Sequence, residues 1–85
     1  MYKVLIVEDD KDLAEALSDK LSAEGFEVSM AYTGEEGSKK AFDEKPDGMI
    51  LDIILPGSKD GIAVLKELRN DSWGRTVPIL ILTNM

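Results

Sequence analysis

The chain has 85 residues, of which 44% are hydrophobic, enough for one small layered core and too many for an obligately disordered segment. Its 17 acidic residues outnumber its 10 basic residues, and the formal net charge of −7 disfavours direct contact with nucleic acid or an anionic membrane surface. The sequence holds no Cys and no His, which excludes disulfides, thiolate or imidazole metal ligands and catalytic histidines, so any chemistry must rely on carboxylates, hydroxyls and backbone groups.

The first two predicted elements are a buried strand and an amphipathic helix. Residues 4–7 (Val-Leu-Ile-Val) form a continuous apolar run, which is typical of a strand covered on both faces in a parallel sheet. Apolar residues then recur every four positions, which predicts one stripe of a helix: Leu13, Leu17 and Leu21. Asp10 is a suitable N-cap for this helix, and Gly25 is a suitable left-handed residue after it.

The next two elements are a half-exposed strand and a short helix. Residues 26–31 alternate between apolar and polar, as in an edge strand. Thr33 and Glu36 have the spacing of a capping box, which predicts a helix from this point to about Glu44. Pro46 ends it.

The second half of the chain repeats the pattern. Residues 49–53 form a third strand that is apolar except for Asp52, and a loop rich in turn residues follows it through Gly61. A further helical stripe comes next: Ile62, Val64, Leu65 and Leu68. Residues 78–82 predict a fourth strand of the buried type.

The predicted order βαβαβαβ indicates a doubly wound α/β fold, a parallel sheet with helices on both faces. We find no linker or internal repeat, so residues 1–85 are expected to form a single domain. The chain stops soon after its last strand, and an apolar strand without a neighbour is prone to pair with another chain. We therefore expect the 85-residue chain to be poorly stable alone or to form a homodimer.

Oxygen-bearing side chains stand where the predicted strands end. Glu8 and Asp9 follow the first strand, Asp52 lies at the end of the third, and Thr83 follows the fourth. Parallel strands bring their carboxyl ends to one edge, where three carboxylates would repel each other unless a cation were present; Mg²⁺ suits such ligands. Acidic residues also favour the first turn of a helix, so residues 8–10 alone would not identify a metal site. Asp52, walled by apolar neighbours, could then act as a nucleophile towards phosphorus, with Thr83 donating a hydrogen bond.

These residues, together with Pro56, the pair Asp60-Gly61 and the run from Pro78 to Thr83, resemble the receiver domain of bacterial two-component response regulators along the whole chain. The resemblance implies a flavodoxin-like sheet of order 2-1-3-4-5, of which this chain supplies the first four strands. The fifth strand, with its lysine, and the last two helices would lie beyond Met85. The chain is therefore expected to be a truncated receiver domain.

The resemblance also implies roles for the site residues. Asp52 would be the phosphoacceptor, Asp9 a direct Mg²⁺ ligand and Glu8 a ligand acting mainly through metal-bound water. The backbone carbonyl of Ile54 would complete the metal site, and Thr83 would be the switch hydroxyl. The phosphoryl group would come from a sensor histidine kinase or a phosphotransfer protein in the cytoplasm. The chain would be a signalling switch and not an enzyme.

Three alternative functions can each be compared with the sequence. A haloacid-dehalogenase-like phosphatase places a second acid two residues after the nucleophile, where this chain has Ile54. A nucleotide- or flavin-binding module needs glycines in the first strand-to-helix turn, where this chain has acidic residues 8–10. A phosphorylation-impaired interaction fragment, associating through its exposed last strand, is the alternative that the missing strand and helices favour.

Overall fold

The computed structural model describes residues 1–82, in which strands and helices alternate. In chain order the elements are β1 (Lys3–Val7), α1 (Lys11–Ala23), β2 (Glu27–Ala31), α2 (Gly34–Glu44), β3 (Gly48–Asp52), α3 (Gly61–Arg69) and β4 (Ile79–Leu82). None of these helices is long and apolar enough to cross a membrane.

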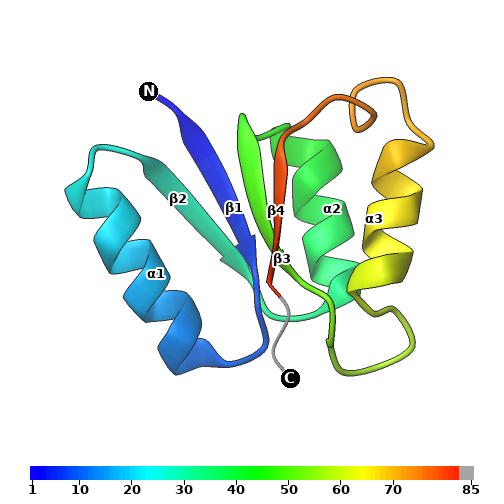
Figure 1. Cartoon of the computed structure of the whole chain (residues 1–85), viewed down its shortest axis with the longest axis horizontal. Helices are drawn as coiled ribbons and strands as arrows, with labels where there is room; N and C mark the ends of the chain where they lie inside the picture. Colours follow the sequence, from blue (N-terminus) through cyan, green and yellow to red (C-terminus); the bar gives the residue numbers. More distant parts are fainter. Residues whose placement is uncertain (83–85) are drawn as a thin grey trace.

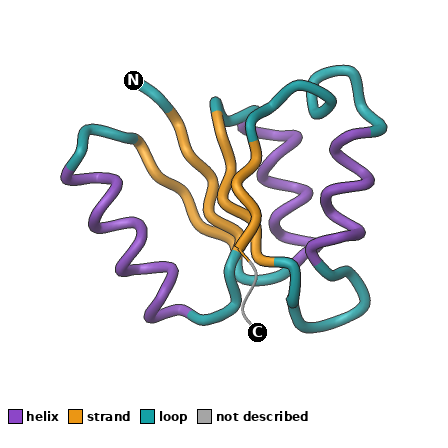
Figure 2. Tube along the Cα trace, in the orientation of Figure 1, coloured by secondary structure: helices purple, strands orange, loops and turns teal. Residues whose placement is uncertain are grey.

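The four strands form one parallel sheet in the order β2-β1-β3-β4. Val4 pairs with Val28 of β2 on one side and with Gly48 of β3 on the other, and Met49 pairs with Ile79 of β4. Helix α1 covers one face of the sheet, and α2 and α3 cover the other (Figures 1 and 2). The predicted doubly wound α/β architecture, its strand order and the edge position of β2 are confirmed.

The alternating side chains of β1 build two separate cores. Val4 and Ile6 point to the α1 face, where they pack with Ala14. Leu5 and Val7 point to the opposite face and join the larger core under α2 and α3, whose buried members also include Ala31, Ala41, Met49, Leu51, Leu55, Val64 and Leu68. β1 is buried on both faces because α1 covers one face of the sheet at this strand, and α2 and α3 cover the other.

Each helix begins at a side-chain cap that the sequence indicates. Asp10, Thr33 and Asp60 accept hydrogen bonds from the backbone N–H groups of Leu13, Glu36 and Ala63, respectively. At α2 the predicted capping box is altered, because the Glu36 carboxylate accepts from the N–H of Tyr32 and not from that of Thr33. Gly25 follows α1 with φ +95°, as predicted for its left-handed position.

Several apolar residues are more exposed than their pattern predicts. Ile62 is 38% exposed, because it lies off the face of α3 that buries Val64 and Leu68. Leu13 is 39% exposed, because α1 buries Ala14 most deeply and turns Leu13 to the side. Leu80 is 62% exposed, so the prediction that the last strand is buried on both faces is wrong.

The exposure of Leu80 has a structural cause. Helix α1 packs over β1 and β2, so within residues 1–82 no helix covers the same face of β3 and β4. An apolar groove of about 330 Å³ lies there, bordered by Leu21 and Phe26 on one side and by Pro78 and Leu80 on the other. On the opposite face, Trp73 from the α3–β4 connection packs edge-on against Phe42 of α2 and contributes to the larger core.

Candidate functional site

The first part of the site is formed where the chain leaves β1. The backbone N–H of Glu8 donates to the carbonyl of Ala31 at 3.0 Å, which extends the sheet contact by one residue and buries the Glu8 side chain to 3% exposure. Asp9, the next residue, is exposed. Asp10 is used as the cap of α1, so it is the member of the acidic run with a structural role. The pair Glu8 and Asp9 therefore offers one buried and one accessible carboxylate.

The second part of the site is Asp52, the last residue of β3. It pairs with Leu82 in the sheet, and its side chain is only 4% exposed. Its Oδ1 atom accepts a hydrogen bond of 3.1 Å from the backbone N–H of Ile54. This bond fixes the direction of the carboxylate through the path of the following loop.

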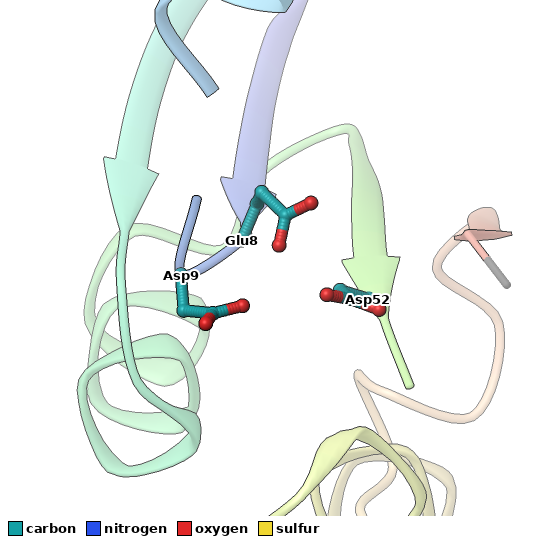
Figure 3. Close-up of side chains that lie close together, drawn as sticks. All are labelled: Glu8, Asp9 and Asp52. Carbon is teal, nitrogen blue, oxygen red and sulfur yellow. The ribbon is translucent and has the colours of Figure 1, made fainter. Parts of the chain in front are cut away.

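The parallel register brings these carboxylates together. Glu8, Asp9 and Asp52 each place a carboxylate oxygen within 4.8 Å of the others, and the three side chains converge on one space (Figure 3). The structure thus joins three of the predicted site residues from two strand ends. Thr83, the fourth, lies outside the described residues.

Burial and the neighbouring charge of Asp52 shift the pKa of Glu8. The pKa of its carboxyl group is raised to about 7 from the ordinary 4.5, first by burial and then by the hydrogen bond and negative charge of Asp52. The backbone N–H of Asp10, 3.5 Å from Glu8 Oε2, partly offsets this by favouring the ionised form. Near neutral pH the cluster therefore needs either a proton or a cation to hold its carboxylates together. The sequence alone did not predict this burial, because it depends on how the ends of β1 and β3 pack.

The donor set fits Mg²⁺. All three side chains supply oxygen, and two ligands of one Mg²⁺ ion lie up to about 4 Å apart, so separations within 4.8 Å need only small side-chain adjustments. The carboxylates border a hollow of about 360 Å³, together with Asp10 and Ile54, which leaves room for the waters that Mg²⁺ retains. Ile54 therefore lies at the site as predicted, and its carbonyl remains a predicted ligand.

The nearby cations are engaged elsewhere. The ammonium of Lys59, in the loop after β3, binds the Glu67 carboxylate of α3 at 2.6 Å. Lys11, at the start of α1, lies over the Tyr32 ring, 5.1 Å from its centre. Within residues 1–82, the side chains that line the hollow are acidic or apolar. No lysine or arginine of the described part therefore neutralises the cluster, which strengthens the case for a bound dication.

Comparison with known proteins gives one consistent family. The sequence profile of the response regulator receiver domain matches residues 4–85. The response regulator TrrA of Thermotoga maritima, solved in complex with Mg²⁺-BeF, is 37% identical with a TM-score of 0.89 over 98% of this chain and 70% of its own. The chemotaxis protein CheY4 of Vibrio cholerae is 34% identical, with a TM-score of 0.92 over 100% of this chain and 70% of its own.

A third similar structure is the receiver domain of a sensor histidine kinase from Pseudomonas aeruginosa, solved with a magnesium ion coordinated in its active-site cleft. It is 29% identical, with a TM-score of 0.90 over 96% of this chain and 66% of its own. The chain thus spans about two thirds of the length of the structures it matches, with shares of 65% to 70% among these and a response regulator from Chloroflexus aurantiacus.

Proposed function

The chain belongs to the response regulator receiver domain family, and from this premise we propose that it accepts a phosphoryl group on Asp52, with Mg²⁺, in two-component signalling. The observation that carries the proposal is the convergence of Glu8, Asp9 and Asp52, two of them buried, on one hollow. The Mg²⁺-BeF complex of TrrA and the magnesium ion of the P. aeruginosa receiver domain support the same choice of metal.

The chemistry follows from the placement of Asp52. Its carboxylate oxygen would attack phosphorus, the bond from phosphorus to the donor's imidazole nitrogen would break, and the electron pair would stay on that nitrogen, which takes up a proton. A bound Mg²⁺ would supply positive charge that offsets the phosphoryl oxygens. Glu8 and Asp9 would hold the cation, and the burial of Asp52 would limit the access of water to the acyl phosphate. Thr83 would respond as the switch hydroxyl.

The same proposal identifies the partners. The phosphoryl donor would be a sensor histidine kinase or a phosphotransfer protein, and the encounter would take place in the cytoplasm, where ATP supplies the phosphoryl group. The chain would act as a switch and not as a hydrolytic enzyme. Ile54 supports this distinction, because an apolar side chain two residues after Asp52 cannot serve as the general acid that a phosphatase of the aspartyl-phosphate type requires.

Incubation with Mg²⁺ and a small phosphodonor such as phosphoramidate tests the proposal. Intact-protein mass spectrometry should detect one added phosphoryl group on the wild-type chain and none on Asp52→Asn. Asp43→Asn is a matched control, because Asp43 is an exposed carboxylate on α2 that pairs with Lys39. It should be labelled like the wild type. A folded wild-type chain that gains no phosphoryl group in Mg²⁺ would refute the proposed function.

We also propose self-association through β4, which specific features of that strand favour. The carbonyl of Pro78 accepts a hydrogen bond from Met49 of β3, and that of Leu82 accepts one from Ile53, just after β3. By alternation, Ile79 and Ile81 direct their backbone N–H and C=O groups to the opposite edge. In residues 1–82 no strand pairs with that edge. All four side chains of β4 are aliphatic, and Leu80 is exposed, so the strand lacks the charges that protect edge strands from pairing.

A further inference from the structure

Helix α3 begins directly on the backbone of the proposed phosphoacceptor. Gly61, its first residue, donates its N–H to the carbonyl of Ile53 at 2.8 Å. A methyl group at Gly61 would overlap the carbonyl oxygen of Asp52 and would lie 2.6 Å from the Cα of Ile53. Because these atoms belong to the backbone, no side-chain rotation relieves the overlap. Any larger residue at this position must displace either α3 or the end of β3.

Helix α2 makes a similar contact with the other end of the same loop. A methyl group at Gly34, the first residue of α2, would overlap the carbonyl oxygen of Lys59 and would lie 2.9 Å from its carbonyl carbon. Ser58 adds a hydrogen bond of 3.2 Å to the Glu35 carboxylate. The Lys59 ammonium binds Glu67 of α3, and this hydrogen bond is the largest cause that lowers the pKa of Glu67. The loop of residues 53–60 is thus attached to both helices.

We propose that Gly34 and Gly61 are positioning residues for the metal site, an inference that rests on the proposed function. They permit two backbone-to-backbone contacts that clamp the loop of residues 53–60 at both ends. The clamp fixes the N–H of Ile54, which holds Oδ1 of Asp52. It therefore sets the separation between the Asp52 carboxylate and those of Glu8 and Asp9. Mg²⁺ demands near-ideal octahedral geometry, so a displaced loop weakens its binding even when all three carboxylates remain.

Gly74, which follows α3, provides a control that distinguishes a positioning role in the metal site from general destabilisation of the fold. A methyl group at Gly74 would overlap the carbonyl oxygen of Leu68 and would lie 2.7 Å from its carbonyl carbon, so the clash is as severe as that at Gly34 or Gly61. Gly74 lies in the α3–β4 connection, at the opposite end of the sheet from the site (Figure 1). Gly74→Ala should lower the stability of the fold and leave the carboxylates in place.

Magnesium titration of the 85-residue chain at pH 8, followed by calorimetry, provides the test, with the folded fraction of each protein measured by circular dichroism. Loss of residues that orient metal ligands typically weakens affinity by about 10- to 100-fold. We expect Gly61→Ala and Gly34→Ala, corrected for folded fraction, to bind Mg²⁺ at least about tenfold more weakly than the wild type. Gly74→Ala should bind it like the wild type.

The outcomes distinguish this inference from the proposed function. Absence of Mg²⁺ binding by the wild type would refute the metal site itself, whereas equal affinity in the wild type, Gly61→Ala and Gly34→Ala would refute the positioning role alone. Equal weakening in all three alanine variants would show that stability, not position, controls affinity, and would also refute the role.

If the alanine variants at Gly34 and Gly61 fail to fold, Ser58→Ala tests whether attachment of the loop controls Mg²⁺ affinity. It removes the hydrogen bond from the loop to Glu35 without adding an atom. Its control is Ser29→Ala, which removes a comparable bond of 2.7 Å to Glu44 on α2, away from the loop. We expect weaker Mg²⁺ binding by Ser58→Ala alone. An unchanged affinity in that variant would overturn the inference.

Discussion

The buried carboxyl group of Glu8 should make the metal-free protein less stable as pH rises. Below about pH 4.5 Glu8 is protonated in both the folded and the unfolded chain, so it adds no difference. Between pH 4.5 and about 7 the unfolded chain ionises at Glu8 while the folded chain retains the proton. The folded state then binds more protons, so its stability falls across this interval and levels off above it. At about 1.4 kcal/mol per pH unit, the loss approaches about 3 kcal/mol.

The substitution Glu8→Gln isolates this effect, because glutamine has nearly the same shape and never ionises. The variant should match the wild type near pH 4.5 and exceed it by up to about 3 kcal/mol at pH 8 in EDTA, as measured by urea unfolding at a series of pH values. Glu15→Gln is the control, since Glu15 is an exposed carboxylate on α1, and it should follow the wild type at every pH. Parallel pH profiles for wild type and Glu8→Gln would refute the reasoning.

Magnesium should oppose the loss of stability that the wild type shows as pH rises. A cation at the cluster favours the ionised form of Glu8, so protons and Mg²⁺ compete for the same group. Saturating Mg²⁺ is therefore expected to stabilise the wild type more at pH 8 than at pH 5. In Glu8→Gln the same addition should give a smaller and flatter gain, because one carboxylate is missing. A stabilisation by Mg²⁺ that is equal at both pH values would contradict the assignment of Glu8 to the cluster.

Two further predictions concern the start of α3 and the outer edge of β4. Asp60→Ala removes the carboxylate that accepts the hydrogen bond from the N–H of Ala63. It should lower the free energy of unfolding in urea by about 1 kcal/mol. A change near zero would show that the cap is dispensable. Leu80→Lys places a charge on the exposed face of β4, so it should shift sedimentation at high protein concentration from dimer towards monomer; a wild type that is monomeric throughout would contradict association through β4.

The sequence predicted most of the fold because the governing signals are local. The continuous apolar run at residues 4–7 indicated a strand with two buried faces, and both faces of β1 are covered. Alternation of strands and helices then fixed a parallel sheet. Parallel strands end at one edge, so the convergence of the carboxylates followed from topology without any knowledge of side-chain packing.

Features that depend on a particular neighbour could not be predicted in this way. Leu80 belongs to an apolar strand, yet whether it is covered depends on where α1 packs relative to β4. Ile62 fits a helical stripe in the sequence, and its exposure depends on the rotation of α3 about its axis. Both are consequences of packing between elements that are distant in the chain. The switch role of Thr83 stays a prediction.

The acidic pair Glu8 and Asp9 shows what the folded structure adds to the sequence. The sequence places Glu8 and Asp9 side by side, and nothing in their residue types says which will be accessible. In the fold, Glu8 is buried beside Asp52 while Asp9 faces solvent. An arriving cation therefore meets the exposed Asp9 first, whereas Glu8, whose pKa is raised by burial, must give up its proton as the cation binds. Two adjacent carboxylates thus differ in accessibility because only Glu8 lies within the sheet contact, and that burial is the largest cause that raises the pKa of Glu8.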